Sequence, residues 1–333
     1  MTAFMQGWLE AFVLWTGISL GCMALLLTHT LTGGRWGDYI RRGAEAGMSG
    51  LALQLIMFVV LWAGAGQLYP WASHPDAWLN LPAFGVRGLA FFAFWLWAAW
   101  RLRRDGLRYE ETGDKRVMAR LQQWAGPVLF FYLLTASFAV VDWTMSLTPG
   151  WASTMFPFLS VTGQWVSATA FCAVLLAGRG TRLNRYDVGS FLLTFVILQA
   201  YCSYCEWILI WSGNMKDEIV FYTPRLVLGW QWIIGAVIVF QWALPFLLLI
   251  WGKFKEDPRS MRSIGAWMLV AEFCHVWWMV APAHQAALRL TIWDVLLPLA
   301  MGAGWWLIVR YIYRSVPQEL THPYVWRPTD GPS

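Results

Sequence analysis

The chain has 333 residues, of which 58% are hydrophobic and 13% charged, and its formal net charge is +5. A soluble domain is nearer half apolar and a quarter charged, so this composition excludes an ordinary soluble protein and predicts a membrane protein. The small excess of positive charge is explained by its placement between membrane spans. It gives no reason to expect nucleic-acid binding.

Nine stretches are long and apolar enough to cross a membrane as helices, because about 20 such residues span roughly 30 Å of hydrocarbon. They cover approximately 8–29, 47–68, 85–102, 125–147, 156–178, 187–212, 226–252, 263–281 and 291–313. The alternating segments of an outer-membrane barrel are not seen. We therefore predict an all-α polytopic fold, with one transmembrane helical domain over 1–314 and a Pro-rich cytoplasmic tail over 315–333.

The placement of positive charge predicts the orientation. Twenty of the 24 Lys and Arg residues fall in alternate loops and in the tail. The opposite side keeps Arg87, Lys216, Arg225 and Arg289. The positive-inside rule then places the N-terminus outside and the C-terminus in the cytoplasm. A miscounted span would scramble this alternation, so the pattern also favours nine spans.

Ionisable residues inside spans are the candidates for chemistry, since each costs about 2.5–3.5 kcal/mol to insert. Glu10, Asp142, Glu206, Glu272 and His275 stand out. A functional interpretation is a proton path or a site for a quinol headgroup, which must lose two protons on oxidation. A structural interpretation is equally open, in which Asp142 and Glu206 bond backbone or tryptophan N–H groups between helices.

Glu272 and His275 are spaced i, i+3, which places them on one helix face near mid-membrane. They could share a proton, or form a self-neutralising structural pair. Heme is not expected, because two facing histidines are needed and only His275 is deep. The five cysteines are scattered, so neither an iron–sulfur cluster nor a metal site is predicted.

Two local predictions concern the ends of spans. The polar segment 103–123 is expected to form a short helix on the inner surface. In the sixth span, Gly213 and Asn214 suit the left-handed position that stops a helix. Asp217 and Glu218 would then face the outer aqueous side.

Several motifs occur in order along the chain, namely "LTGGRWG" at 31–37, "LYPW" at 68–71, "VDWTMSLTPGWAST" at 141–154, "IWSGNMKDE" at 210–218, "YTPR" at 222–225 and "WWMVAPA" at 277–283. Together they resemble the F-type membrane subunit of bacterial alternative complex III, a quinol:electron-acceptor oxidoreductase. That subunit belongs to the wider polysulfide-reductase (NrfD-like) membrane family. The resemblance covers nearly the whole chain.

The resemblance implies a subunit without heme or cluster of its own, embedded in the lipid of the bacterial inner membrane. It implies as partners a homologous NrfD-like quinol-binding subunit, an iron–sulfur/molybdopterin-type subunit, a multiheme cytochrome c and, in some complexes, a terminal oxidase. Quinone or quinol would be the bound cofactor. The positions that match the family motifs are Asp142, Trp143, Ser146, Trp151, Ser153, Trp211, Ser212, Asn214, Glu218 and Arg225.

The chain also departs from the family pattern. Thr148 and Ala152 stand where Glu and Phe are usual, and Glu206 stands where Gln is usual. Glu272 and His275 replace the usual Arg and Asp. The expected function is support of quinol oxidation, a proton path and complex assembly. The alternatives are a stand-alone transporter and a purely structural membrane anchor.

Overall fold

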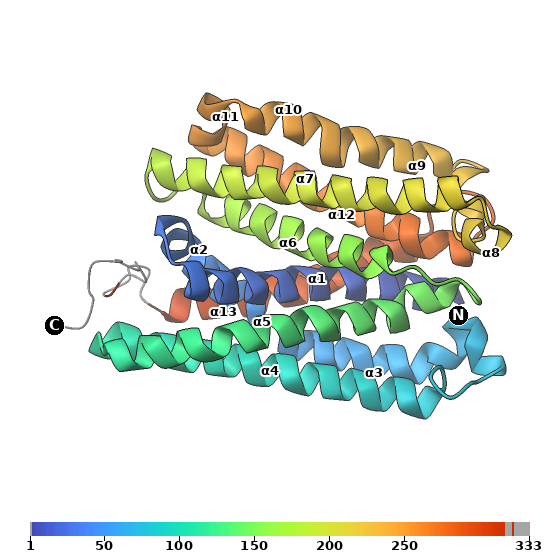
Figure 1. Cartoon of the computed structure of the whole chain (residues 1–333), viewed down its shortest axis with the longest axis horizontal. Helices are drawn as coiled ribbons and strands as arrows, with labels where there is room; N and C mark the ends of the chain where they lie inside the picture. The colour runs from blue at the N-terminus through green and yellow to red at the C-terminus, as the bar shows by residue number, and fades with distance from the viewer. Residues whose placement is uncertain (1, 317–321, 323–333) are drawn as a thin grey trace.

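The computed structural model describes residues 2–316 and His322, and within this part every regular element is helical (Figure 1). The longer helices are α1 (Thr2–Thr32), α2 (Arg35–Met48), α3 (Leu51–Leu68), α4 (Leu81–Thr112), α5 (Lys115–Trp143), α6 (Met155–Leu176), α7 (Arg182–Gly213), α9 (Trp230–Val237), α10 (Leu244–Ile250), α12 (Pro258–Val280) and α13 (Ile292–Ser315). Short elements connect them: η1 (Pro70–Ser73), η2 (Met145–Leu147), α8 (Lys216–Ile219), η3 (Thr223–Leu226), η4 (Ile238–Ala243), α11 (Gly252–Glu256) and η5 (Ala281–Ala283).

The predicted fold class is confirmed, because nine helical segments of the described chain are long and apolar enough to cross a membrane. Six of them contain the predicted stretch and extend beyond it into the adjoining polar sequence. The other three, Met155–Leu176, Trp230–Ile250 and Ile292–Ser315, overlap the predicted stretches 156–178, 226–252 and 291–313 but begin later or end earlier. In Figure 1 the first residues of α1 and the last residues of α13 lie at opposite ends of the bundle, as an odd number of spans requires. Which end faces the cytoplasm stays a prediction from the charge pattern.

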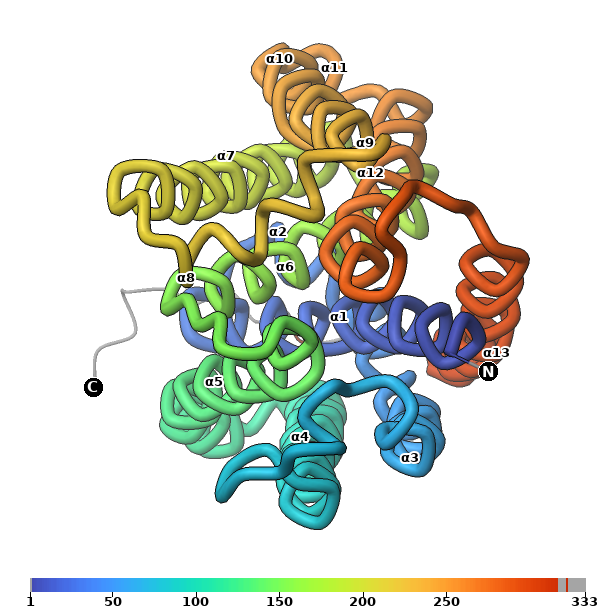
Figure 2. The backbone as a smooth tube through the Cα atoms, turned by 90° about the vertical axis from the view of Figure 1, so that its right-hand side faces the viewer, coloured from blue at the N-terminus to red at the C-terminus, as the bar shows by residue number. Residues whose placement is uncertain are grey.

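The first helix runs through the centre of the bundle. It packs against α2, α3, α5, α6, α12 and α13. Seen along the bundle, α3, α4 and α5 lie on one side of α1, while α7, α9 and α10 lie on the other (Figure 2). Of the most apolar part of α1, 78% is buried, against 22% for the span that includes α9 and α10. Helix α1 is therefore the core, and the α9–α10 span is peripheral.

The prediction of a separate short helix within 103–123 is wrong. Helix α4 continues to Thr112 and α5 begins at Lys115, so the segment forms the end of a long antiparallel hairpin. Gly113 adopts the left-handed conformation, with φ of 63°, and ends α4. The side chain of Asp114 accepts a hydrogen bond from the Arg116 N–H and caps α5. Two good caps on adjacent residues explain why the helices meet without a linker.

The helix α2 was not predicted, because its arginines look like an ordinary basic loop. Two of them are instead buried in a cluster of ion pairs. Arg41 Nε lies 3.0 Å from Glu45 Oε1, and Arg42 Nη1 lies 3.0 Å from Glu45 Oε2. Arg42 also pairs with Glu110 near the end of α4. The cluster thus connects α2 to α4 at the arginine-rich end of the bundle.

The predicted cytoplasmic tail, 315–333, lies outside the described residues apart from Ser315, Val316 and His322. Ser315 is the last residue of α13, so the helix reaches the predicted boundary. His322 Nδ1 lies 2.9 Å from the carbonyl oxygen of Glu110. The one described residue further along the tail therefore contacts the end of α4.

The crossing of α1 and α6 predicts a strong dependence on one glycine. A Cβ added at Gly21 would lie 2.7 Å from the carbonyl carbon of Gln164 on α6, whereas one added at Gly235 in α9 would meet nothing within 4 Å. We expect Gly21→Ala to destabilise the protein by about 1–3 kcal/mol through overpacking. The matched control, Gly235→Ala, should be neutral or stabilising by up to about 1 kcal/mol. Thermal unfolding in detergent measures both, and equal midpoints would contradict the close crossing.

Candidate functional site

Asp142, at the end of α5, forms an ion pair with Arg87. Arg87 on α4 donates to it from Nε at 2.8 Å and from Nη2 at 2.9 Å. The Trp78 indole N–H donates a third bond at 3.1 Å, and the Arg87 guanidinium lies 4.3 Å from the Trp78 ring centroid. With its oxygens satisfied in this way, Asp142 fastens the start of α4 to the end of α5 and is separate from the other candidates.

The motif residues next to Asp142 make further contacts between elements. Ser146 Oγ donates to the Asp142 carbonyl at 2.6 Å and accepts from the Trp71 indole at 3.1 Å. The Trp143 carbonyl accepts from the Tyr69 hydroxyl at 2.9 Å. The "VDWTMS" motif therefore joins α5 to the α3–α4 connection, which is a structural task.

The second motif is joined to the first. The Trp151 indole donates to the Glu218 carbonyl at 3.1 Å, and its ring stacks on Phe221 with centroids 4.1 Å apart. Asn214 ends α7 in the left-handed conformation, with φ of 47°, as predicted. Trp211 and Ser212 are exposed on the outside of this turn. The two motifs thus build one cap over the end of the bundle.

Arg225, in η3, is fully buried in this cap, and no carboxylate of the described residues pairs with it. Its Nη1 donates to the Phe221 carbonyl at 2.6 Å and its Nη2 to the Met279 carbonyl at 2.7 Å. The guanidinium carbon lies 3.5 Å from the Phe221 ring centroid. Burial lowers the pKa of Arg225 to about 9, since removal from water disfavours the charged form. Arg225 holds η3 against the end of α12.

Glu206 on α7 is buried, and neither of its carboxylate oxygens has a hydrogen-bond partner in the structure. Its polar neighbours are the side chains of Ser153 and Tyr222. A buried acid with no charged partner among the described residues costs free energy, and such groups in membrane spans are functional candidates by default. Glu206 therefore differs from Asp142, which has a structural explanation.

Glu272 on α12 lies in a cluster of uncharged amides. Its Oε2 accepts from Gln199 Nε2 of α7 at 3.2 Å and also from Gln241 Nε2 of η4. The Trp242 indole donates to Gln199 Oε1 at 3.3 Å, which closes the network. Gly163 on α6 leaves room for the carboxyl, because a Cβ there would lie 2.5 Å from Glu272 Oε1. Four elements thus converge on one carboxyl group.

The seventh span is not a regular α-helix at this depth. Residues Ile238–Ala243 form a π-helical turn, η4, between α9 and α10. Pro245 has no N–H for the carbonyl of Gln241 four residues earlier, so the α pattern cannot run through this turn. Such turns are rare and often lie at functional sites. Here the turn carries Gln241 and Trp242, the two residues that face the Glu272 cluster.

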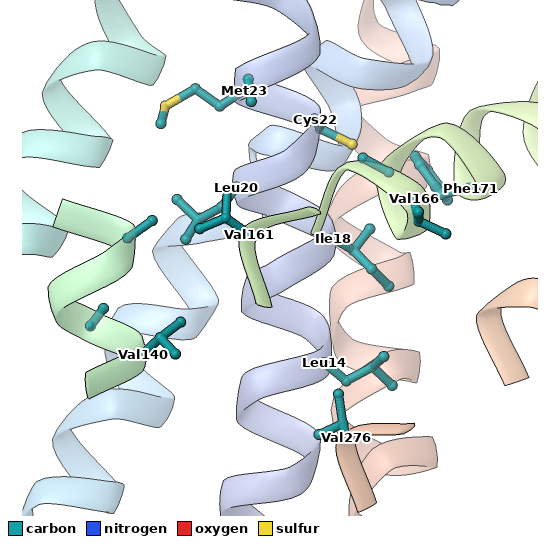
Figure 3. Close-up of a cluster of buried hydrophobic side chains, with 14 of the residues drawn as sticks. Leu14, Ile18, Leu20, Cys22, Met23, Val140, Val161, Val166, Phe171 and Val276 are labelled. Carbon is teal, nitrogen blue, oxygen red and sulfur yellow. The ribbon is translucent and has the colours of Figure 1, made fainter. Parts of the chain in front are cut away.

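A cavity of about 40 Å³ lies on the other side of Glu272, where α1, α5, α6 and α12 meet. Part of its lining is apolar. Figure 3 shows three of these side chains, which are Leu14 from α1, Val140 from α5 and Val276 from α12. Its polar lining consists of Thr16, Thr144, Ser160, Gln164, Ser167 and Glu272. A polar space of this size can hold about two or three water molecules.

His275 opens on a different space. It lines a groove of about 390 Å³ between α7, α9, η4 and α12, which we call the aromatic groove. Tyr204 and Trp207, on the α7 side, are 60% and 41% exposed, so the groove faces the membrane. Its remaining lining includes Leu159, Ala200, Ser203, Tyr222, Leu226, Ile234, Ile238, Trp242 and Trp278.

The structure therefore brings three of the four candidates into one region. His275 lines the aromatic groove, Tyr222 of the same groove neighbours Glu206, and Trp242 belongs to the Glu272 network. Glu272 and His275 make no hydrogen bond with each other in the described chain, and His275 Nδ1 has no partner. Although they are close in sequence, they face two different spaces on α12.

Sequence reasoning missed the partners of these groups. Gln199 and Gln241 carry no charge, so a search for ionisable residues passes over them, although glutamine is costly in a span as well. Arg87 was noted only as a charge on the sparsely charged side. Its place at the start of a span, where few cations occur, is the signal that could have identified it as a partner for Asp142.

No cluster of three or more His, Cys, Asp or Glu side chains that could hold a metal ion is found over residues 2–316 and His322. The five cysteines are free and lie in helices. No protein-family model matches this chain, and no curated protein matches it in a sequence comparison. The residues themselves therefore carry the functional argument.

The pairing of Arg87 with Asp142 predicts strong energetic coupling. Asp142→Leu or Arg87→Leu alone leaves the partner charge uncompensated, and each should cost about 3 kcal/mol of stability. The double variant should cost much less than the sum of the two. Denaturant titration of the single and double variants in detergent measures this coupling. Additive effects would show that the pair is not an energetic unit.

Proposed function

We propose that this chain is an integral membrane subunit of a quinol-oxidising respiratory complex of the alternative complex III type, located in a bacterial inner membrane. In this proposal the aromatic groove receives the quinol headgroup, and the nearby acids take up or pass on its protons. The observation that carries the proposal is the membrane-facing groove with His275 in its wall. The order of the sequence motifs adds to it.

The groove suits a quinone in size and in chemistry. Its volume of about 390 Å³ falls in the range of small-molecule pockets, roughly 300–1,000 Å³. The tyrosine, serine and histidine side chains supply a few polar groups among aromatic and aliphatic ones. Because the groove faces the bilayer, a lipophilic quinol can enter it from the hydrocarbon.

The positions of the titratable groups support a role in proton release. Oxidation of a quinol to a quinone releases two protons with two electrons, so a group able to accept a proton must lie near the headgroup. His275 lines the groove, although the residue is 1% exposed and its buried Nδ1 has no hydrogen-bond partner among the described residues. Glu206 lies beyond Tyr222, and Glu272 lies behind Trp242 beside the water-sized cavity.

The electrons would pass to redox groups in other subunits. The partners we propose are an iron–sulfur/molybdopterin-type subunit, a multiheme cytochrome c and a second, homologous membrane subunit. In this proposal the partners dock at the end of the bundle with few positive charges, where Trp211, Ser212 and Asp217 are exposed.

One observation favours a transporter as the second candidate. Interrupted helices near the middle of the membrane are typical of transport sites, and η4 interrupts the seventh span beside Glu272. A transporter would work without redox partners. Isolation of the tagged protein from its native membrane in mild detergent separates the two. Copurified heme and iron–sulfur proteins are expected, whereas a colourless protein that purifies alone would contradict the proposal.

The aromatic groove predicts where quinone binding can be blocked. Ala200 lines the groove, whereas Ile197, on the same helix, does not line it and is 46% exposed. We expect Ala200→Trp to fill the groove and to weaken binding of a quinone analogue at least about tenfold, which is 1.4 kcal/mol. The control Ile197→Trp adds a similar bulk toward lipid and should bind as the wild type does. Quenching of tryptophan fluorescence by the analogue, or a photoreactive quinone, gives the measurement.

Two substitutions then test the proton role separately from binding. His275→Phe should keep the ring volume and allow assembly, but it should slow quinol oxidation in the isolated complex. Glu272→Gln should keep both amide contacts and remove only the acid. If both variants assemble and oxidise quinol at the wild-type rate, His275 and Glu272 take no part in proton release.

A further inference from the structure

A second groove, of about 530 Å³, opens at the arginine-rich end of the bundle. It lies between the end of α6 and the end of α13, both on the left in Figure 1. Leu175 and Arg179 contribute from the α6 side, and Trp306, Arg310, Tyr313 and Arg314 contribute from α13. We call it the basic groove.

The groove gathers positive charge from two elements. Arg310 and Arg314 are one helical turn apart on the same face of α13, and both are exposed. Arg179 reaches across from α6, where its Nη1 donates to the Tyr313 hydroxyl at 2.6 Å and its guanidinium carbon lies 5.1 Å from the ring centroid. The described lining contains no Asp or Glu. Arg310 and Arg314 place two positive charges beside this hollow, which favours binding of an anion.

Two other arginines at this end of the bundle have acidic partners. Arg42 pairs with Glu45, and Arg101 pairs with Asp105 at 2.7 Å. Arg310 and Arg314 form no ion pair within the described chain. A structural explanation for these arginines is that positive charges in the last turn of a helix offset the helix dipole. That effect is the same on every side of the helix end. It does not account for their position opposite Arg179 on one groove.

One wall of the basic groove is apolar. Leu175, Trp306 and Val309 line it, and Trp306 is 42% exposed toward the bilayer. A ligand that matches both parts needs an anionic head and a hydrocarbon tail. A free phosphate would use only the arginines and would leave the apolar wall uncovered.

We propose that the basic groove binds an anionic phospholipid. The phosphate lies between Arg310 and Arg314, which present forked donors that suit phosphate oxygens. One acyl chain lies along Trp306 and Leu175. Basic pockets between helix ends at the cytoplasmic side of membranes bind lipids of this class. This site is remote from the aromatic groove and does not depend on the proposed function.

The test is lipid retention by the full-length protein. The protein is purified in non-ionic detergent and equilibrated with phosphatidylglycerol and phosphatidylethanolamine of matched chains, and the bound lipids are counted by native mass spectrometry. We expect wild-type protein to retain phosphatidylglycerol preferentially. The double variant R310Q/R314Q should lower this retention about tenfold or more, because each arginine near the surface contributes to the attraction.

A matched control removes the same charge elsewhere. Arg116 and Arg120 are also exposed, four residues apart and at the arginine-rich end of a helix, but they do not line the basic groove. The variant R116Q/R120Q should retain phosphatidylglycerol within about twofold of wild type. R310K/R314K keeps the charge and should retain most of the lipid, which separates loss of charge from misfolding.

Three results would overturn the proposal. The first is wild-type protein without preference for phosphatidylglycerol, which needs no variant to be folded. The second is equal retention by R310Q/R314Q and the control. The third is displacement of the lipid by millimolar inorganic phosphate that binds with the same arginine dependence, since the site would then be one for a free anion.

Discussion

Hydrocarbon offers no hydrogen-bond partner, and this constraint accounts for most of the polar architecture of the bundle. Asp142 is matched by Arg87 and Trp78, and Glu272 is matched by two glutamine amides. The buried arginines of α2 are matched by Glu45 and Glu110. Against this background Glu206 and His275 are notable, because neither has a charged partner among the described residues and each keeps a buried polar atom without a hydrogen bond.

The central position of α1 determines where the remaining spaces can form. Helix α1 contacts seven other helices of the described chain, so its few polar residues meet protein. Thr16 therefore contributes to the small cavity next to Glu272. The peripheral span with α9 and α10 is the least buried, and the aromatic groove lies between this span and its neighbours. Helix α12 carries Glu272 and His275, and it separates the small cavity from the aromatic groove.

The number and placement of the spans could be predicted because they depend on segment length and hydropathy. The end of α7 at Asn214 was also predictable, since local backbone preference determines it. The α4–α5 hairpin was not, because a polar sequence does not reveal whether a helix continues beyond the membrane. The partners of Glu272 were not predictable either. Gln199 and Gln241 are distant in sequence, and only the packing of three helices brings their amides to one point.

The π-helical turn has a consequence for how the sequence can vary. Such a turn contains one residue more than an α-helix of the same path, so it behaves as an insertion confined to the seventh span. Deletion of a single residue from 238–243 would remove the extra residue, and positions within the turn would shift by roughly 100° relative to the flanking helices. Gln241 and Trp242 could not then both keep their contacts. The length of the segment 238–243 is therefore as constrained as the identity of its residues.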